Sequence, residues 1–285
     1  MMQKRNVAGA ESFLQEIQKS KLDLPCSPDL LEKLSDIVYE GSLTTVEEVG
    51  ALIDHDQSFS AKALALANSA FYGFQGRVTS IGRAVSVLGL REIRNMVFLM
   101  LYKRLSARID ARFFDFPSYL IHNYQVAVLA KELSMMAGHG DPEEVFTAGL
   151  LHDIGKILTA IYRAEDWKRI IAKDDTAPVW KAEQEYWGMD HGTVAEVALK
   201  SWNMPPVLSE PVGCHHRPKS ASRHHEEALL IQLADCFAHR FDPGNGESQG
   251  DVPDTRGVIS GDPEEVAQKL QYAYSRSLHK ALLLT

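Results

Sequence analysis

Apolar residues recur every three or four positions through most of this sequence, which is the spacing of one face of an α-helix. The segment 30–38 is typical, with apolar side chains at Leu30, Leu31, Leu34, Ile37 and Val38. No segment shows the sustained alternation of apolar and polar residues that a half-buried β-strand requires. The sequence therefore predicts an all-α fold.

Helix-start signals divide this pattern into separate helices. Asp141-Pro142-Glu143-Glu144 combines an N-cap Asp, a Pro at the first helical position and acidic residues in the first turn. We expect the helix that it opens to run on through Leu150–Ile161. The same signature at 262–265 predicts a C-terminal helix that reaches about Leu283. The spacing also predicts helices over 46–53, 56–66, 81–88, 91–105 and 119–136.

The pattern becomes irregular and polar between Ser106 and Pro117, which predicts a boundary between two parts. We expect an N-terminal helical subdomain over residues 1–110 and a second helical subdomain over residues 111–285. The stretch 242–262 contains five Gly, two Pro and four Asp without periodicity. It is predicted to be a mobile surface loop.

Charge and cysteine content narrow the environment and the partners. The 285 residues carry 30 Lys and Arg against 38 Asp and Glu, a formal net charge of −8, whereas general nucleic-acid and anionic-membrane binders need a basic face. The basic residues of the segment 77–104 spread around several helix faces, so we do not expect nucleic acid there either. Three widely spaced cysteines imply no disulfide framework, and no stretch approaches the roughly 18 apolar residues of a membrane span. We expect a cytoplasmic protein without a membrane partner.

The sharpest local motif is His152-Asp153-Ile154-Gly155-Lys156, which lies within an otherwise apolar helical run. His152 and Asp153 are two adjacent residues that can both bind a metal ion. Gly155 would let another backbone or a ligand approach closely. Lys156 lies four residues after His152, hence on the same helix face, and its ammonium could meet a phosphate.

Further metal-capable residues lie on other predicted helices or at their ends: His122, His191, His215, His216 and Asp235. Asp235 has mostly apolar neighbours, and a buried carboxylate needs a charged partner, either a metal ion or an arginine. Taken singly, each histidine is more often a surface residue or a hydrogen-bonded core residue than a ligand.

Imidazole and carboxylate ligands together suit divalent zinc, iron, manganese or nickel. One ion could be held by His122, His152, Asp153 and Asp235. A second ion could be held by His191, His215 and His216, with Asp153 between the two. Two such ions would activate a water molecule and clamp a phosphorus centre, which is the physical logic of phosphoester hydrolysis.

The ordered set of these residues resembles the HD phosphohydrolase superfamily, and the first half of the chain resembles its HDOD branch (the HD-related output domain of bacterial signalling proteins). The matching segments are Leu24-Pro25, Ile53–Phe59, Ala65–Gly73 and Ser80–Gly89, which contain the motifs NSAFYG and AVSVLG. The resemblance implies an HD-domain-like helical bundle that follows an N-terminal HDOD subdomain, and a role in signal transduction.

The resemblance further implies a metal-dependent phosphohydrolase that acts on a nucleotide or another phosphorylated small molecule. Asp153 and Lys156 would be its catalytic residues, and one or two divalent ions (Fe, Mn, Zn or Ni) would be bound at the two sets of ligands given above. Arg217-Pro218-Lys219-Ser220 follows the His215-His216 pair, where the HD-GYP branch has a Glu and then Gly-Tyr-Pro. Ser118 stands where that branch often has a ligand Glu. These departures argue against cyclic-di-GMP specificity and against a three-metal site.

Many HDOD proteins act as binding modules, so the sequence leaves a non-catalytic alternative open. In that alternative the metal site is structural or vacant, and the NSAFYG segment contacts a signalling protein through Asn68, Ser69, Phe71 and Tyr72. The competing interpretation of this segment is a helix stop, in which Asn68 hydrogen-bonds local backbone.

Overall fold

The computed structural model describes residues 7–19, 45, 57–68, 78–172, 178–242 and 254–284, and every regular element within these ranges is helical. The all-α prediction is confirmed. The predicted helices over 30–38 and 46–53 lie outside the described residues. None of the described helices is long and apolar enough to cross a membrane.

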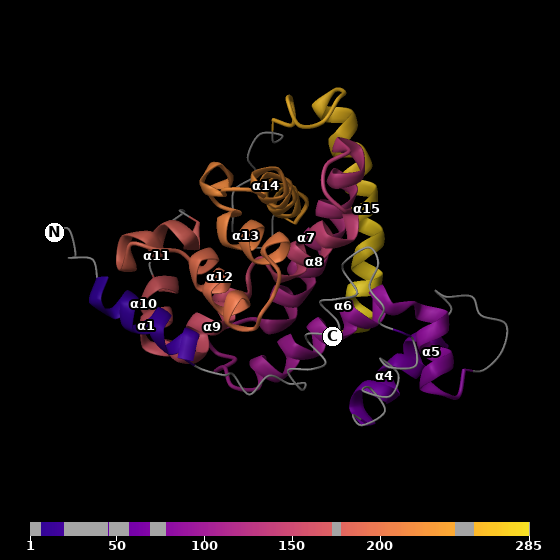
Figure 1. Cartoon of the computed structure of the whole chain (residues 1–285), viewed down its shortest axis with the longest axis horizontal. Coiled ribbons are helices and arrows are strands. Elements are labelled where there is room, and N and C mark those ends of the chain that lie inside the picture. Colours follow the sequence, from indigo (N-terminus) through magenta and orange to yellow (C-terminus); the bar gives the residue numbers. More distant parts are fainter. Residues whose placement is uncertain are drawn as a thin grey trace. The chain divides into compact units, whose positions relative to one another are not determined.

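The helices follow one another as shown in Figure 1. Their bounds are α1 (Val7–Lys19), α4 (Gln57–Ala67), α5 (Ile81–Leu88), α6 (Leu90–Ser106), α7 (Phe116–Ala137), α8 (Pro142–Leu151), α9 (Ile154–Tyr162), α10 (Ala164–Ile171), α11 (Val179–Trp187), α12 (His191–Ser201), α13 (Pro206–Cys214), the 3₁₀ turn η1 (Pro218–Ser220), α14 (His225–Phe241) and α15 (Pro263–Leu284). The expected start of α8 is present, because the Asp141 carboxylate accepts hydrogen bonds from the backbone N–H groups of Glu143 and Glu144.

The chain divides into two compact units, one of residues 1–22 and 105–285 and the other of residues 23–104. The predicted division differs at its start, because it placed residues 1–22 in the first subdomain. Helix α1 instead packs against α11 and α12. Phe13 is fully buried, and its ring centroid lies 5.7 Å from that of Trp187. An amphipathic helix shows which face it buries, but not which part of the chain covers that face.

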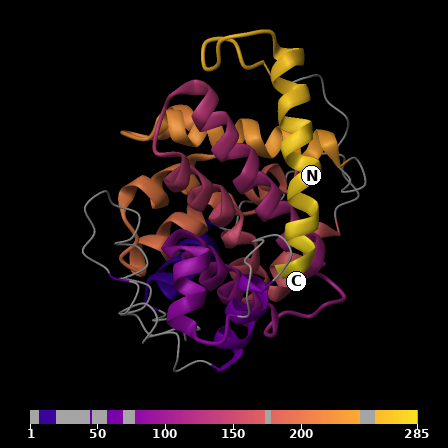
Figure 2. The ribbon, with the colours of Figure 1, turned by 90° about the vertical axis from the view of Figure 1, so that its right-hand side faces the viewer.

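In the larger unit α7 is the central helix, packed against α8, α14 and α15. Both views show α15 running alongside α7 (Figures 1 and 2). Most of α7 is buried, including the polar side chains of His122, Asn123 and Gln125. Helix α12 packs against α1, α9 and α13 on another side of this unit. Polar residues on such central helices need partners inside the protein, because water does not reach them.

The smaller unit has an apolar core formed by α4, α5 and α6, with buried side chains that include Ala63, Val85 and Ile93. Asn68 ends α4 and ties it to the chain before α5. Its Nδ2 donates to the carbonyls of Leu64 (2.8 Å) and Val78 (2.9 Å), and its Oδ1 accepts from the Val78 N–H at 2.8 Å. The Asn68 side chain thus makes the backbone contacts that the helix-stop interpretation expects.

Two predicted features fall partly outside the described residues. Ser69, Phe71 and Tyr72 are not described, so a partner-binding NSAFYG segment stays a prediction. Of the predicted mobile loop 242–262, residues 243–253 are not described, and 254–262 form turns without a helix. Its mobility likewise stays a prediction.

Candidate metal centre

His152 and Asp153 separate α8 from α9, and the backbone leaves the helical path at Asp153. The predicted single helix through Leu150–Ile161 is therefore interrupted, with Asp153 at φ −97° and ψ 7°. Two residues further on, a Cβ placed on Gly155 would come within 1.9 Å of the His191 carbonyl oxygen. Helix α9 thus begins in direct backbone contact with α12, as the glycine in this motif suggested. The interruption leaves both His152 and Asp153 fully buried.

His122 on α7 and Asp235 on α14 meet beside His152. The Nε2 atom of His122 lies 3.1 Å from Oδ1 of Asp235, and Nε2 of His152 lies 3.8 Å from the same oxygen. The Nε2 atom of His152 also lies 3.5 Å from Oδ2 of Asp153. The four residues that were expected to hold a first ion are therefore neighbours in the structure.

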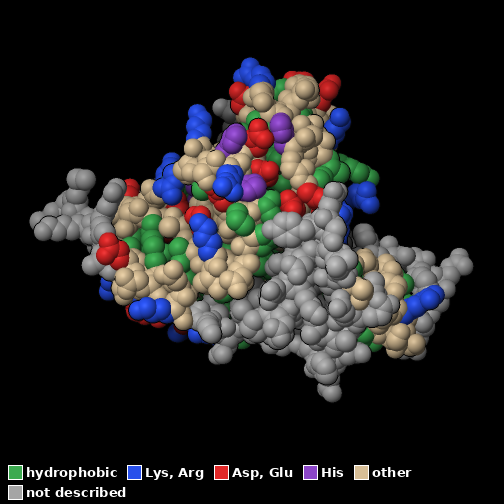
Figure 3. All heavy atoms as spheres, viewed as in Figure 1, with side chains coloured by type: hydrophobic (Ala, Val, Ile, Leu, Met, Phe, Trp, Pro, Cys, Tyr) green, Lys and Arg blue, Asp and Glu red, His purple; other side chains and the backbone are tan. Residues whose placement is uncertain are grey.

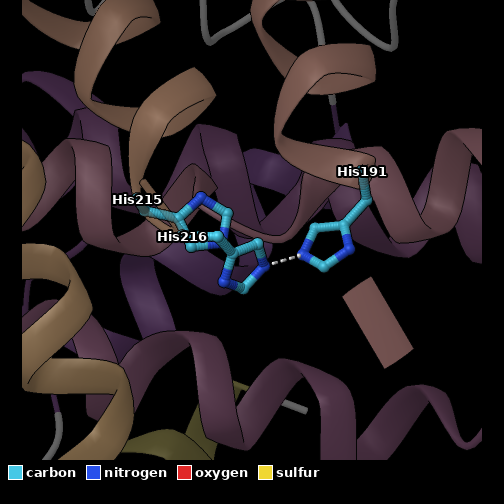
Figure 4. A group of neighbouring side chains, drawn as sticks. All are labelled: His191, His215 and His216. Carbon is cyan, nitrogen blue, oxygen red and sulfur yellow. Dashed lines mark hydrogen bonds between the residues drawn. The ribbon is translucent and has the colours of Figure 1, made fainter. Parts of the chain in front are cut away.

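His191, His215 and His216 form a second group on the other side of Asp153. Figure 4 shows the three rings, with Nε2 of His216 and Nε2 of His191 2.9 Å apart. The Nε2 atom of His191 also lies 2.9 Å from Oδ1 of Asp153. The two oxygens of Asp153 therefore face different histidines, one from each group.

Local signals at the start of α12 position His191 in this group. Asp190 is the N-cap, and its Oδ1 accepts from the backbone N–H (3.1 Å) and the hydroxyl (3.2 Å) of Thr193. A Cβ on Gly192 would lie 2.9 Å from the carbonyl oxygen of Gly213, so only a glycine lets the start of α12 come this close to the end of α13. That contact brings His191 beside the His215-His216 pair, which directly follows α13.

Hydrogen bonds to backbone fix the orientation of two of the rings. Nδ1 of His152 donates to the carbonyl of Gly149 (2.8 Å), and Nδ1 of His215 donates to the carbonyl of Val212 (2.6 Å). With the proton on Nδ1, each Nε2 carries the lone pair and is free to bind a metal ion.

Several buried atoms of the site make no hydrogen bond within the described part of the chain: Nε2 of His122, His152 and His215, and Oδ1 of Asp153 and Asp235. Buried polar atoms are nearly always hydrogen-bonded, and an ion that is missing from a structure is one recognised reason for an exception. These are nitrogen and oxygen atoms of the kinds that bind divalent zinc, iron, manganese or nickel. The residues of this site could therefore hold a metal ion.

Glu183 on α11 belongs to this site, although the sequence did not single it out. Its side chain is fully buried, and its Oε2 accepts from both the backbone N–H (2.8 Å) and Nδ1 (2.7 Å) of His191. Burial lowers the pKa of His191, but the charges of Glu183 and Asp153 outweigh it and raise that pKa to about 10. Glu183 stands four residues before Trp187, so the two side chains lie on one face of α11, and that face is buried. This spacing was the signal in the sequence.

His239 on α14 is a second residue that the sequence analysis missed. Its Nε2 lies 3.3 Å from Oδ1 of Asp235, and its ring centroid lies 4.6 Å from that of His122. It stands four residues after Asp235, so the two side chains share one helix face. That spacing could have identified it.

At His152, His216, Asp153 and Asp235 the environment sets protonation states that suit metal binding, whereas the raised pKa of His191 favours its charged form, which must lose a proton before it can bind an ion. Burial lowers the pKa of His152 to about 3 and holds the pKa of His216 well below its ordinary range. Burial raises the pKa of Asp153 and Asp235, but the surrounding imidazoles and, at Asp153, the Lys156 ammonium outweigh it, so both carboxyl pKa values lie well below their ordinary range. Neutral imidazoles and ionised carboxylates are the forms that bind metal ions.

One edge of the site reaches solvent. Asp235, His239 and Lys156 are only partly buried, and Nζ of Lys156 lies 2.6 Å from Oδ2 of Asp153. The space-filling view shows histidine side chains next to acidic ones at the surface (Figure 3). Trp180 stacks on His216 with the ring centroids 5.0 Å apart. A small molecule would have to approach from this edge, because the inner ligands are covered.

The sequence matches a protein family and a bacterial protein. The HDOD domain model matches residues 24–218. An uncharacterised protein of Treponema pallidum (strain Nichols) is 24% identical over 197 residues, which are 68% of this chain but 38% of that protein, so the chain spans about two fifths of the length of this relative.

Two crystal structures match nearly the whole chain. An HDOD domain protein of unknown function from Geobacter sulfurreducens superposes with a TM-score of 0.76 at 20% identity, and the match covers 98% of this chain and 99% of that one. A candidate phosphohydrolase from Shewanella amazonensis SB2B has a TM-score of 0.73 at 26% identity, with 96% and 98% of the two chains covered. Both likenesses support the same all-α fold.

Proposed function

The chain belongs to the HDOD family, and we propose that it is a signalling protein that holds divalent metal ions between its histidines and aspartates and hydrolyses a phosphoester. The observation that carries the proposal is the convergence of buried Nε2 and Oδ1 atoms that make no hydrogen bond to any described residue. A site with no ion would leave these atoms desolvated, at a cost of about 1–3 kcal/mol for each one.

The residues present provide for two ions. His122, His152, Asp153 and Asp235 would hold the first ion. The second would be held by His191, His215 and His216. Asp153 could contribute to both, because its Oδ1 faces His191 and its Oδ2 faces His152.

Bound divalent ions would supply positive charge that polarises a phosphoryl oxygen and makes water acidic enough to act as a nucleophile near neutral pH. The protein contributes the arrangement around them. Lys156 is held by Asp153 at 2.6 Å and is 20% exposed, so its ammonium can reach a phosphate that enters from the open edge. The covered inner ligands exclude bulk water, which strengthens the attraction between Lys156 and a phosphate. The substrate class is a nucleotide or another phosphorylated small molecule.

The test combines metal content with hydrolysis of a simple phosphoester. Purified protein is stripped with a chelator, reloaded with Mn²⁺, Fe²⁺, Zn²⁺ or Ni²⁺, and assayed for bound metal and for cleavage of bis(p-nitrophenyl) phosphate and p-nitrophenyl phosphate.

His152→Ala and Asp153→Ala are expected to lose bound metal and to reduce cleavage more than about 100-fold. Lys156→Ala is expected to keep its metal and to lose about 10²–10³-fold in rate. Lys200→Ala, on an exposed face of α12, is the matched control. A wild-type protein that retains no stoichiometric metal after any of these loadings would overturn the proposal.

The ion pair between Lys156 and Asp153 favours a second function, that of a non-catalytic module. Lys156 is already engaged by Asp153, and the innermost ligands are covered by protein. A metal ion in such a site would tie α7, α9, α12, α13 and α14 together and set the shape of a surface that a signalling protein contacts. This function predicts stoichiometric metal in the wild type without cleavage of either phosphoester. It also predicts that His152→Ala lowers thermal stability.

A further inference from the structure

His122, Asp235 and His239 form a group at the edge of the site, which we call the outer triad. The Nε2 atoms of both histidines approach the same carboxylate oxygen, Oδ1 of Asp235, at 3.1 Å for His122 and 3.3 Å for His239. The ligand atoms of the three residues all lie within 4.8 Å of one another. Two imidazoles and a carboxylate at this separation form a set of ligands for a divalent transition-metal ion.

Two helices build the outer triad in a rigid way. Asp235 and His239 are four residues apart on α14, so their side chains leave the helix on one face, one turn apart. His122 comes from α7, which packs against α14. Ligands fixed on packed helices need little rearrangement when an ion binds, so less binding energy is lost in ordering them.

The contact between His122 and Asp235 in the outer triad is not a well-aligned hydrogen bond. Nε2 of His122 lies 3.1 Å from Oδ1 of Asp235, yet neither atom has a well-aligned hydrogen bond within the described part of the chain. They are close together but wrongly aligned for a proton between them. A buried imidazole nitrogen and a buried carboxylate oxygen that lie this close without a well-aligned hydrogen bond are suitable ligands for one ion.

The outer triad is more accessible than the remainder of the site. The side chains of His122, Asp235 and His239 are 9%, 17% and 18% exposed, whereas those of His152 and Asp153 are 1% and 2% exposed. An ion here would have protein ligands on its inner side and room for solvent or a substrate oxygen on its outer side. Catalytic metal sites share this open coordination position, whereas structural sites are closed.

We propose that His239 is a metal ligand, which completes the outer triad on the solvent side of the first ion. The inference rests on the proposed function, because it assigns a further ligand to the same metal centre. An ion held by these residues would lie where α7 meets α14, at the more exposed edge of the site, and a phosphate oxygen could reach it there.

The test uses Co²⁺ alone as the probe, because its visible absorption reports the number and type of ligands. Stripped wild-type protein, His239→Ala, His239→Gln and His225→Ala are titrated with Co²⁺ and followed by calorimetry and absorption, with circular dichroism as the check on folding. His225 lies on the same helix and is exposed, so it is the matched control. We expect His239→Ala to weaken binding of the first ion by at least about tenfold and to change its spectrum. The spectrum of the second ion and all properties of His225→Ala should remain those of the wild type.

His239→Gln separates a ligand from a residue that only holds Asp235. Its amide keeps an N–H donor for the carboxylate but lacks the imidazole, so we expect it to behave like His239→Ala. Wild-type affinity and spectrum in His239→Gln would overturn the inference, as would an unchanged first ion in His239→Ala. A wild-type protein that binds no Co²⁺ at all would instead overturn the proposed function itself.

Discussion

At the scale of single residues, the carboxylate of Glu183 decides which nitrogen of His191 faces the site. Oε2 of Glu183 accepts the proton on Nδ1, so Nε2 points toward Asp153 and His216. A carboxylate behind a ligand imidazole fixes the ring and raises its basicity, and such partners contribute strongly to metal affinity. In the proposed metal centre, Glu183 would thus be a positioning residue.

The first prediction concerns this contact. Glu183→Ala should lower the affinity of the second ion by about 10–100-fold, because His191 loses the partner that orients it. Glu183→Gln should fall between Ala and the wild type, since its amide oxygen can still accept from the imidazole. Competition with a chromophoric chelator measures the affinity. Glu185→Gln, an exposed position on the same helix, should match the wild type. Equal affinities in Glu183→Ala and Glu185→Gln would remove the positioning role.

At the scale of helices, the contact between α9 and α12 depends on Gly155. A Cβ at this position would lie 1.9 Å from the His191 carbonyl oxygen, which is backbone and cannot rotate away. Gly155→Ala should therefore lower the free energy of unfolding by about 1–3 kcal/mol, the usual cost of overpacking. Urea unfolding followed by circular dichroism measures this change.

Gly82 in α5 provides the matched control for Gly155→Ala, because a Cβ there would meet nothing within 4 Å. Gly82→Ala should leave stability unchanged or raise it by up to about 1 kcal/mol, since alanine favours the helix. Equal effects of the two substitutions would show that α9 and α12 are not in tight contact.

The loop that leads into α14 is held by one carboxylate, that of Glu210 on α13. Oε1 of Glu210 accepts from the backbone N–H (2.6 Å) and the hydroxyl (2.5 Å) of Ser222, and Oε2 accepts from the His224 N–H at 3.3 Å. Burial opposes ionisation of Glu210, but these hydrogen bonds outweigh it and lower the pKa from its ordinary value of 4.5. The loop that leads to Asp235 is therefore fastened by an ionised side chain.

This arrangement predicts a pH dependence of stability. A carboxyl whose pKa is lower in the folded state stabilises the protein above its unfolded pKa, and the contribution is lost as the pH falls through the folded pKa. Glu210→Gln should lower the free energy of unfolding by about 1–2 kcal/mol at pH 7. The difference from the wild type should shrink as the pH falls below about 4.5. Glu11→Gln, at an exposed position, should show no such difference, and a pH-independent effect of Glu210→Gln would contradict the assignment.

At the scale of the whole molecule, the sequence predicted the helical class, the bounds of helices such as α5 and α15, and the order of the metal-capable residues. It did so because helix periodicity and cap residues are local signals. The interruption at Asp153 was missed, because the apolar pattern continues across it and the contact of Gly155 with α12, just beyond it, joins segments that are distant in the sequence. The place of α1 was missed for the same reason. Glu183 was hidden because burial of a carboxylate depends on the helices that cover it.

The central claim is that the histidines and aspartates of the larger unit form a metal centre. Anomalous X-ray diffraction from crystals of the protein loaded with Mn²⁺ tests it most directly, because it locates the ions and their ligands in one measurement. We predict an anomalous peak bordered by His122, His152, Asp153 and Asp235, and a second one bordered by His191, His215 and His216. A map in which both positions lack an anomalous peak would contradict the account.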